Sequence, residues 1–159
     1  MVVLVDGGTA MGERRSIGRL ISYLYRLTGS YLHERLKKHG IGSGQVPLLM
    51  RLYRGDGINQ DQLAKELRID KATCTRGLRK LERAGYVRRI SDEADRRAYR
   101  ICLTERARKL QPTVEKALEE WTKHLLSGFS DEEREMVFDL LERLVANASA
   151  WKAGGGKDV

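Results

Sequence analysis

The sequence has few of the residues that build disulfide frameworks or metal sites. It contains two cysteines, Cys74 and Cys102, and three histidines, His33, His39 and His124. Their spacings match neither a disulfide framework nor a set of metal ligands. We therefore expect a protein of the reducing cytosol that uses no metal and no cofactor.

The sequence also lacks a long hydrophobic run. No segment approaches the roughly 20 apolar residues that a membrane-spanning helix requires, and the apolar stretch at residues 1–5 is too short for the core of a signal peptide. This favours a soluble, cytoplasmic protein. Residues 1–15 show no helical period and residues 151–159 are rich in glycine, so we expect a flexible N-terminal arm and a frayed C-terminal tail.

The sequence is rich in positively charged residues. Its 159 residues carry a formal net charge of +8, and the charge is unevenly distributed. Residues 71–100 contain ten basic and four acidic residues, whereas residues 131–143 contain two basic and six acidic residues. A chain of this length has room for one sizeable core. The segregated basic charge indicates a polyanionic partner that binds residues 71–100.

Amphipathic helices are predicted on both sides of this basic region. From Ser16, a candidate helix cap, apolar residues recur every three or four positions. The same period follows Thr104 and Ser130, two further candidate caps. Ser43 is expected to cap another helix, with Pro47 near its first turn, where a missing N–H costs little.

Residues 59–84 have the pattern of a helix–turn–helix. Asn59 and Gln62 have the chemistry of a capping box at the start of one short helix. Asp70 is expected to cap a second helix after a tight break at Ile69 and Asp70. This spacing is typical of a helix pair that reads DNA.

The second of these helices is expected to have one buried and one outward face. Stepping 100° per residue places three apolar side chains on one face: Cys74, Leu78 and Leu81. The outward face is polar and basic, and carries Ala72, Thr73, Arg76, Arg79, Lys80 and Arg83.

A basic hairpin is predicted after Gly85, which suits a left-handed helix stop. Two β-prone runs, residues 86–90 and 99–103, flank a charged tip. The strands are too short to do more than project this tip from the body of the protein. The sequence therefore predicts a β-wing beside the helix pair.

Three motifs resemble those of a known family. The segment DKATCTRGLRKLERAGYV at residues 70–87, the segment DEADRRA at residues 92–98 and the LTE at residues 103–105 are similar to motifs of the MarR family of winged-helix transcriptional regulators. The resemblance covers residues 16–150. It implies a homodimer whose terminal helices interlock and whose two wings straddle a pseudo-palindromic operator, most often as a repressor.

The expected fold class is mainly α with a small β-wing, an α+β winged helix–turn–helix with a helical dimerisation lobe. Residues 43–103 would form the DNA-binding lobe, and residues 16–42 together with 104–150 the dimerisation lobe. The leucine-rich faces of the outer helices are too large for the small winged-helix lobe to cover, so they are expected to bury one another across a two-fold axis.

DNA contacts are expected from the second helix of the pair and from the wing. In the wing, the resemblance implies that Arg97 enters the minor groove and that Asp95 holds it in place. An ordinary solvated helix face and ordinary turn residues are the alternative interpretations. The candidate DNA-binding residues are Lys71, Ala72, Thr73, Thr75, Arg76, Arg79, Lys80, Asp95, Arg96 and Arg97.

An effector site is expected between the lobes. Tyr23, Arg26 and Tyr53 interrupt otherwise apolar helices, and an arginine beside aromatic rings suits a small aromatic carboxylate such as salicylate. The resemblance also suggests phenolic ligands. The alternative is that these three residues are exposed or interfacial polar groups.

Two rival functions remain open on the sequence. A thiol-redox sensor would use Cys74 or Cys102, although peroxide-sensing members of the family carry their reactive cysteine near the start of the first long helix, where this chain has none. A winged-helix protein-interaction module would bind DNA weakly. An enzyme is not expected, because nothing near Asp92 and Asp95 supplies a nucleophile or a metal cluster.

Overall fold

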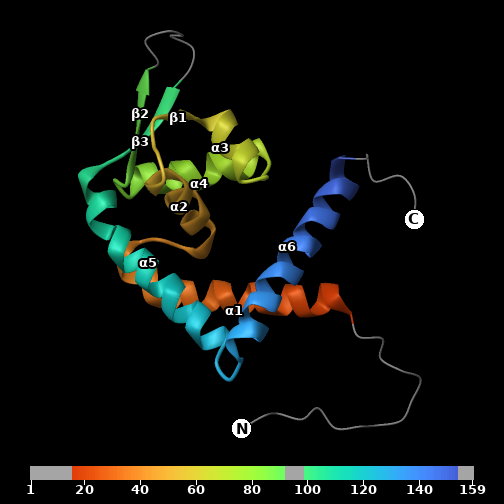
Figure 1. Cartoon of the computed structure of the whole chain (residues 1–159). Helices are drawn as coiled ribbons and strands as arrows, with labels where there is room; N and C mark the ends of the chain where they lie inside the picture. The colour runs from red at the N-terminus through yellow and green to blue at the C-terminus, as the bar shows by residue number, and fades with distance from the viewer. Residues whose placement is uncertain (1–15, 92–98, 154–159) are drawn as a thin grey trace. The chain divides into compact units, whose positions relative to one another are not determined.

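The computed structural model describes residues 16–91 and 99–153 (Figure 1). The chain forms two compact units, residues 1–114 and 115–159. Most of the described residues are helical, and one small antiparallel sheet lies in the first unit. The expected fold class, mainly α with a small β-wing, is therefore confirmed.

The first unit begins with α1 (Ile17–Leu36). Ser16 is its cap, as predicted, because the Ser16 hydroxyl accepts a hydrogen bond from the Arg19 backbone N–H at 3.2 Å. A short 3₁₀ turn (Lys37–His39) follows and ends at Gly40, which has a φ of 70°. Only the C-terminal part of α1 is buried in the single chain.

The helix α2 (Val46–Tyr53) has Pro47 in its first turn, as predicted. The predicted cap at Ser43 is wrong, because Ser43 is the first residue of a 3₁₀ turn (Ser43–Gln45) that precedes α2. The Gln45 side-chain oxygen accepts a hydrogen bond from the Gly42 backbone N–H at 2.9 Å. This longer side chain reaches back to the start of the turn and satisfies a donor there.

The sheet has three antiparallel strands in the order β1-β3-β2. The hairpin is made by β2 (Val87–Ser91) and β3 (Tyr99–Leu103), in a register that pairs Val87 with Leu103. The edge strand β1 (Ile58–Asn59) pairs with β3 on its other side. The hairpin was predicted from the sequence at residues 86–90 and 99–103, and its first strand begins and ends one residue later than predicted.

An apolar core holds the sheet against the helix pair α3 (Gln60–Glu66) and α4 (Lys71–Arg83). Tyr86 is its largest fully buried side chain, and its hydroxyl donates a hydrogen bond to the His39 carbonyl at 2.8 Å. The Arg106 guanidinium lies 4.8 Å from the centre of the Tyr86 ring. Fully buried leucines of α1, α2, α3 and α4 contribute to this core: Leu36, Leu48, Leu49, Leu52, Leu63, Leu78 and Leu81.

The helix α5 (Glu105–Leu125) begins in the first unit, where the Thr104 hydroxyl accepts a hydrogen bond from the Ala107 N–H at 3.3 Å. The second unit holds the rest of α5 and α6 (Asp131–Ala153). A full capping box begins α6, as predicted: Ser130 N–H donates to the Glu133 carboxylate at 2.8 Å, and Glu133 N–H donates to the Ser130 hydroxyl at 3.2 Å. Within residues 16–91 and 99–153, no helix is both long and apolar enough to cross a membrane.

Candidate nucleic-acid interface

The turn between α3 and α4 sets the geometry of the helix pair, and the two helices pack against each other (Figure 1). The break is slightly earlier than predicted, because α3 ends at Glu66 and Arg68 adopts a left-handed φ of 53°. The Ile69 N–H then donates to the Ala64 carbonyl at 3.1 Å and closes the turn. The chain therefore changes direction sharply just before Asp70, the residue that caps α4.

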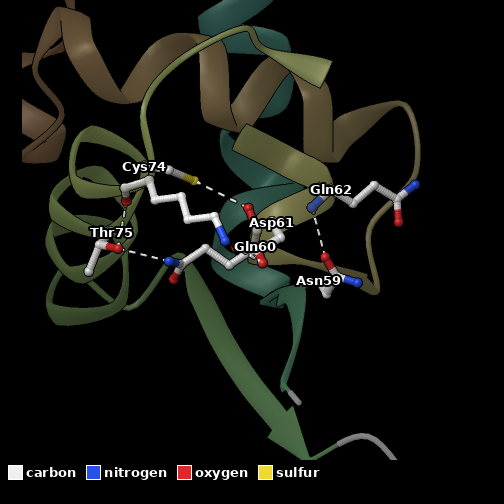
Figure 2. Close-up of polar contacts among 7 residues, drawn as sticks. Asn59, Gln60, Asp61, Gln62, Cys74 and Thr75 are labelled. Atoms are coloured by element: carbon white, nitrogen blue, oxygen red, sulfur yellow. Dashed lines mark hydrogen bonds and ion pairs between the residues drawn. The ribbon is translucent and has the colours of Figure 1, made fainter. Parts of the chain in front are cut away.

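Side-chain caps start both helices of the pair. The Asn59 side-chain oxygen accepts a hydrogen bond from the Gln62 N–H at 2.7 Å (Figure 2). The reciprocal half of the predicted capping box is wrong, because the Gln62 amide instead donates to Glu66 at 2.9 Å, one helical turn later. Asp70 accepts a hydrogen bond from the Thr73 N–H at 2.8 Å, which confirms it as the cap of α4.

The buried face of α4 is the predicted one. Cys74, Leu78 and Leu81 are fully buried. Sequence reasoning missed Gly77, which is also buried on this face. A Cβ atom at Gly77 would lie 2.4 Å from the Leu48 Cδ1 atom, so a glycine is needed for α4 to approach α2 this closely.

The opposite face of α4 is exposed and basic, as predicted. Thr75 lies between the two faces and is half-buried. Its hydroxyl donates to the Lys71 carbonyl at 2.7 Å and accepts from the Gln60 side-chain amide at 2.8 Å (Figure 2). Thr75 therefore ties α4 to the first turn of α3. The exposed candidate DNA-binding residues of α4 are Lys71, Ala72, Thr73, Arg76, Arg79 and Lys80.

Two further contacts organise the first turns of the helix pair. The Lys71 ammonium lies 2.8 Å from the Asp61 carboxylate of α3, and both side chains are largely exposed. The Thr73 hydroxyl lies 2.6 Å from Asp70 Oδ2, and the Arg76 guanidinium donates to the Thr73 hydroxyl at 2.8 Å. Hydrogen bonds from Thr73 lower the pKa of the Asp70 carboxyl. Sequence reasoning missed the role of Asp61, because no local pattern relates it to Lys71.

Exposed arginines also lie on the strands of the wing. The side chains of Arg88, Arg89 and Arg100 lie on β2 and β3 and are exposed, with Arg89 Nε 3.5 Å from the Glu82 carboxylate. Sequence reasoning singled out the tip of the wing and missed these strand arginines, although their positions in β-prone runs were visible. The predicted tip residues Asp95, Arg96 and Arg97 lie outside the described residues.

Asp56 anchors the base of the wing, a role that sequence reasoning also missed. Its carboxylate Oδ2 accepts a hydrogen bond from the Leu103 N–H of β3 at 2.6 Å. The same oxygen accepts a hydrogen bond from the Arg108 guanidinium of α5 at 3.1 Å. One carboxylate therefore joins the loop before β1 to the end of β3 and the start of α5.

The three predicted effector residues occupy two places. The Arg26 guanidinium lies 5.7 Å from the centre of the Tyr23 ring on α1. The Tyr53 hydroxyl of α2 donates to the Ala107 carbonyl at 3.0 Å. A hollow of about 620 Å³ lies elsewhere in the first unit, along α2, β1 and α3, with the Arg51–Glu66 ion pair in its wall. None of the three predicted residues lines that hollow.

Both cysteines are free thiols with different surroundings. Cys74 is fully buried against α3, with its sulfur 3.8 Å from the Gln60 carbonyl oxygen, and burial raises the pKa of its thiol. Cys102 is half-buried on β3. A raised thiol pKa opposes the formation of the thiolate on which redox sensing depends.

Comparisons with known proteins agree with this geometry. The profile of the MarR family matches residues 41–99. An uncharacterised HTH-type transcriptional regulator, YybA of Bacillus subtilis (strain 168), is 32% identical over 129 residues, which are 81% of this chain and 86% of YybA.

Solved structures are similar over most of the chain. A MarR transcriptional regulator from Methanosarcina mazei Go1 has 48% sequence identity and a TM-score of 0.78, and the match covers 84% of this chain and 96% of that one. The MepR protein of S. aureus, in a complex with DNA, has 27% identity and a TM-score of 0.77, with 83% and 98% of the two chains covered. The chain therefore belongs to the MarR family of winged-helix transcriptional regulators.

Proposed function

We propose that this regulator binds a pseudo-palindromic DNA operator as a homodimer, acts as a repressor and is released by a small aromatic effector. The observation that carries the DNA-binding part is the geometry of α4. This helix starts at a side-chain cap, buries one apolar face and leaves its basic face exposed beside an arginine-rich wing. The similar MepR chain has been solved in complex with DNA, which supports the same ligand here.

In this proposal α4 enters the major groove. Arg76 reads a base edge, since a guanidinium can donate two hydrogen bonds to guanine O6 and N7. Lys71, Arg79 and Lys80 contact phosphates, and Lys71 lies at the N-terminal end of α4, where the helix dipole also favours an anion. At the wing tip, Arg97 enters the minor groove and Asp95 orients it, with Arg96 beside them.

The remaining helices form the dimer. Residues 16–42 and 104–150 supply the dimerisation lobe, and residues 43–103 supply the DNA-binding lobe. The two recognition helices of such a dimer reach successive major grooves about one helical turn, ~34 Å, apart. The exposed apolar residues of α1 and α6 support this proposal, because a single chain leaves them facing solvent.

Selection of bound sites from random duplex DNA tests the function. We expect an enriched inverted repeat, and Arg76→Ala should relax the preference at one position of each half-site by about 1–3 kcal/mol. Lys116→Ala removes an exposed positive charge from α5 and should leave the preference unchanged. Weak binding without any enriched sequence would reject this function and favour the protein-interaction module.

The effector part rests on the chemistry of Tyr23, Arg26 and Tyr53. A small aromatic carboxylate such as salicylate could pair with the Arg26 guanidinium and stack on an aromatic ring. The contact between Arg26 and Tyr23 supports this proposal. Millimolar salicylate should raise the melting temperature and weaken operator binding, and Arg26→Ala should abolish both effects. A parent protein that shows neither effect would reject this site.

A further inference from the structure

A chain of three side chains runs along the exposed face of α4. The Asp70 carboxylate contacts the Thr73 hydroxyl at 2.6 Å, and the Arg76 guanidinium Nη2 contacts the same hydroxyl at 2.8 Å. The other Asp70 oxygen accepts from the Thr73 N–H at 2.8 Å. The cap of the helix and the proposed base-reading arginine are therefore connected through one hydroxyl group.

The direction of each hydrogen bond follows from the groups involved. An ionised carboxylate has no hydrogen to donate, so the Thr73 hydroxyl must donate its only hydrogen to Asp70. Its oxygen then offers lone pairs to the guanidinium, which can only donate. Asp70 thereby fixes the hydroxyl in the orientation that accepts from Arg76.

This arrangement leaves most of the guanidinium available. Arginine carries five N–H donors, and the contact of Arg76 with Thr73 uses the Nη2 group. A long, exposed side chain otherwise loses rotamer freedom when it binds DNA. An arginine that a neighbouring hydroxyl already holds loses less rotamer freedom on binding. The plane of its guanidinium group is also defined before it contacts a base.

We infer that Thr73, held by Asp70, is a positioning residue that sets the base discrimination of Arg76. This inference rests on the proposed function, because it assigns the means by which the DNA-reading helix discriminates. In this role the Thr73 hydroxyl acts through Arg76 and makes no contact with DNA itself. A direct contact between Thr73 and a phosphate is the competing role, and it would contribute to binding whether or not Arg76 is present.

A double-mutant cycle separates the two roles. Thr73→Val removes the hydroxyl and keeps the branched shape, while Thr73→Ser keeps the hydroxyl as the matched control. Each is measured with Arg76 present and in the Arg76→Ala background, on the selected operator and on random duplex DNA. The measured quantity is the ratio of the affinity for the operator to the affinity for random DNA.

With Arg76 present, Thr73→Val should lower the operator-to-random ratio by roughly tenfold, the scale of a weakened bidentate base contact. Thr73→Ser should retain the ratio. In the Arg76→Ala background, Thr73→Val should have no further effect. An equal loss in both backgrounds, or a ratio that Thr73→Val leaves unchanged, would overturn the inference.

Asp70→Asn provides a second variant if Thr73→Val does not fold. Asparagine is as good a cap as aspartate, but it replaces one carboxylate oxygen by an amide N–H₂ group that cannot accept the Thr73 hydrogen. We expect Asp70→Asn to lower the operator-to-random affinity ratio as much as Thr73→Val does, again only when Arg76 is present. If the parent protein does not prefer its selected operator over random DNA, the proposed function is rejected. If the parent does prefer its operator but the effects of the Thr73 and Arg76 substitutions are additive, only the positioning role is rejected.

Discussion

Gly77 lies where α4 comes closest to α2. A Cβ atom there would be 2.4 Å from the Leu48 Cδ1 atom, and Leu48 is only 1% exposed. Because the buried leucine cannot turn into solvent, Gly77→Ala should force α4 outward and lower the free energy of unfolding by about 1–3 kcal/mol. Urea denaturation measures this change.

Gly44 provides the control for this substitution. It lies on the neighbouring 3₁₀ turn, and a Cβ atom there would meet nothing within 4 Å. Gly44→Ala should therefore leave the unfolding free energy nearly unchanged. If both alanine variants were equally stable, the close approach of α4 to α2 would not be the reason for glycine at position 77.

The thiol of Cys74 should be unreactive in the folded protein. It is fully buried, and its pKa is raised by burial, so its thiolate fraction at pH 7 is below that of an ordinary cysteine and grows only at higher pH. Iodoacetamide at pH 7 should modify the half-buried Cys102 first and Cys74 only after unfolding in urea. Modification or peroxide oxidation of Cys74 in the native state would instead favour the thiol-redox sensor.

At the scale of elements, the position of the wing depends on contacts that cross between elements. The hairpin β2–β3 pairs with β1 on one edge, and the loop before β1 supplies Asp56 to the end of β3. Asp56 also holds Arg108 on the first turns of α5. The wing is therefore attached at its base to the loop after α2 and to α5.

Loss of the Asp56 carboxylate should loosen this attachment. Asp56→Ala leaves the part-buried Leu103 N–H without its acceptor, which should cost about 1–3 kcal/mol of unfolding free energy. The Leu103 amide should also exchange its hydrogen faster, as measured by NMR. Asp61→Ala removes an exposed ion pair with Lys71 and should change stability little. Unchanged exchange at Leu103 in Asp56→Ala would contradict this account of the wing.

At the scale of the whole molecule, exposed apolar surface predicts self-association. Five apolar residues of α1 are between 38% and 57% exposed: Ile17, Leu20, Ile21, Leu24 and Leu27. On α6 the exposed apolar residues are Met136, Phe138, Leu140, Leu141, Leu144, Val145 and Trp151. Apolar faces of this extent on a single chain indicate an interface.

We expect a dimer in the absence of DNA at micromolar concentration, measured by light scattering. Leu141→Asp should shift the protein toward monomer, because a carboxylate would be buried without a partner in the interface. Asp139 lies two residues away and so on the opposite side of α6, and Asp139→Ala should remain dimeric. A parent protein that is monodisperse as a monomer would exclude the proposed dimer.

Much of the secondary structure followed from the sequence because its signals are local. Ser16, Asp70 and Ser130 each cap a helix through a hydrogen bond between residues three apart, so a short segment contains both partners. The buried face of α4 and the hairpin follow in the same way from periodicity and from turn residues, although the first strand, predicted at 86–90, pairs with 99–103 through residues 87–91.

Contacts between residues that lie far apart in the sequence were decided only by the tertiary structure. Tyr86 binds the His39 carbonyl, Asp56 holds Leu103, and Gly77 lies against Leu48. Local propensity and periodicity describe which face of an element is apolar but not which distant group it meets, because that depends on how the packed elements are spaced and oriented. The sequence by itself therefore determined the helix that carries the basic residues, whereas packing decided how closely α4 lies to α2 and where the wing is anchored.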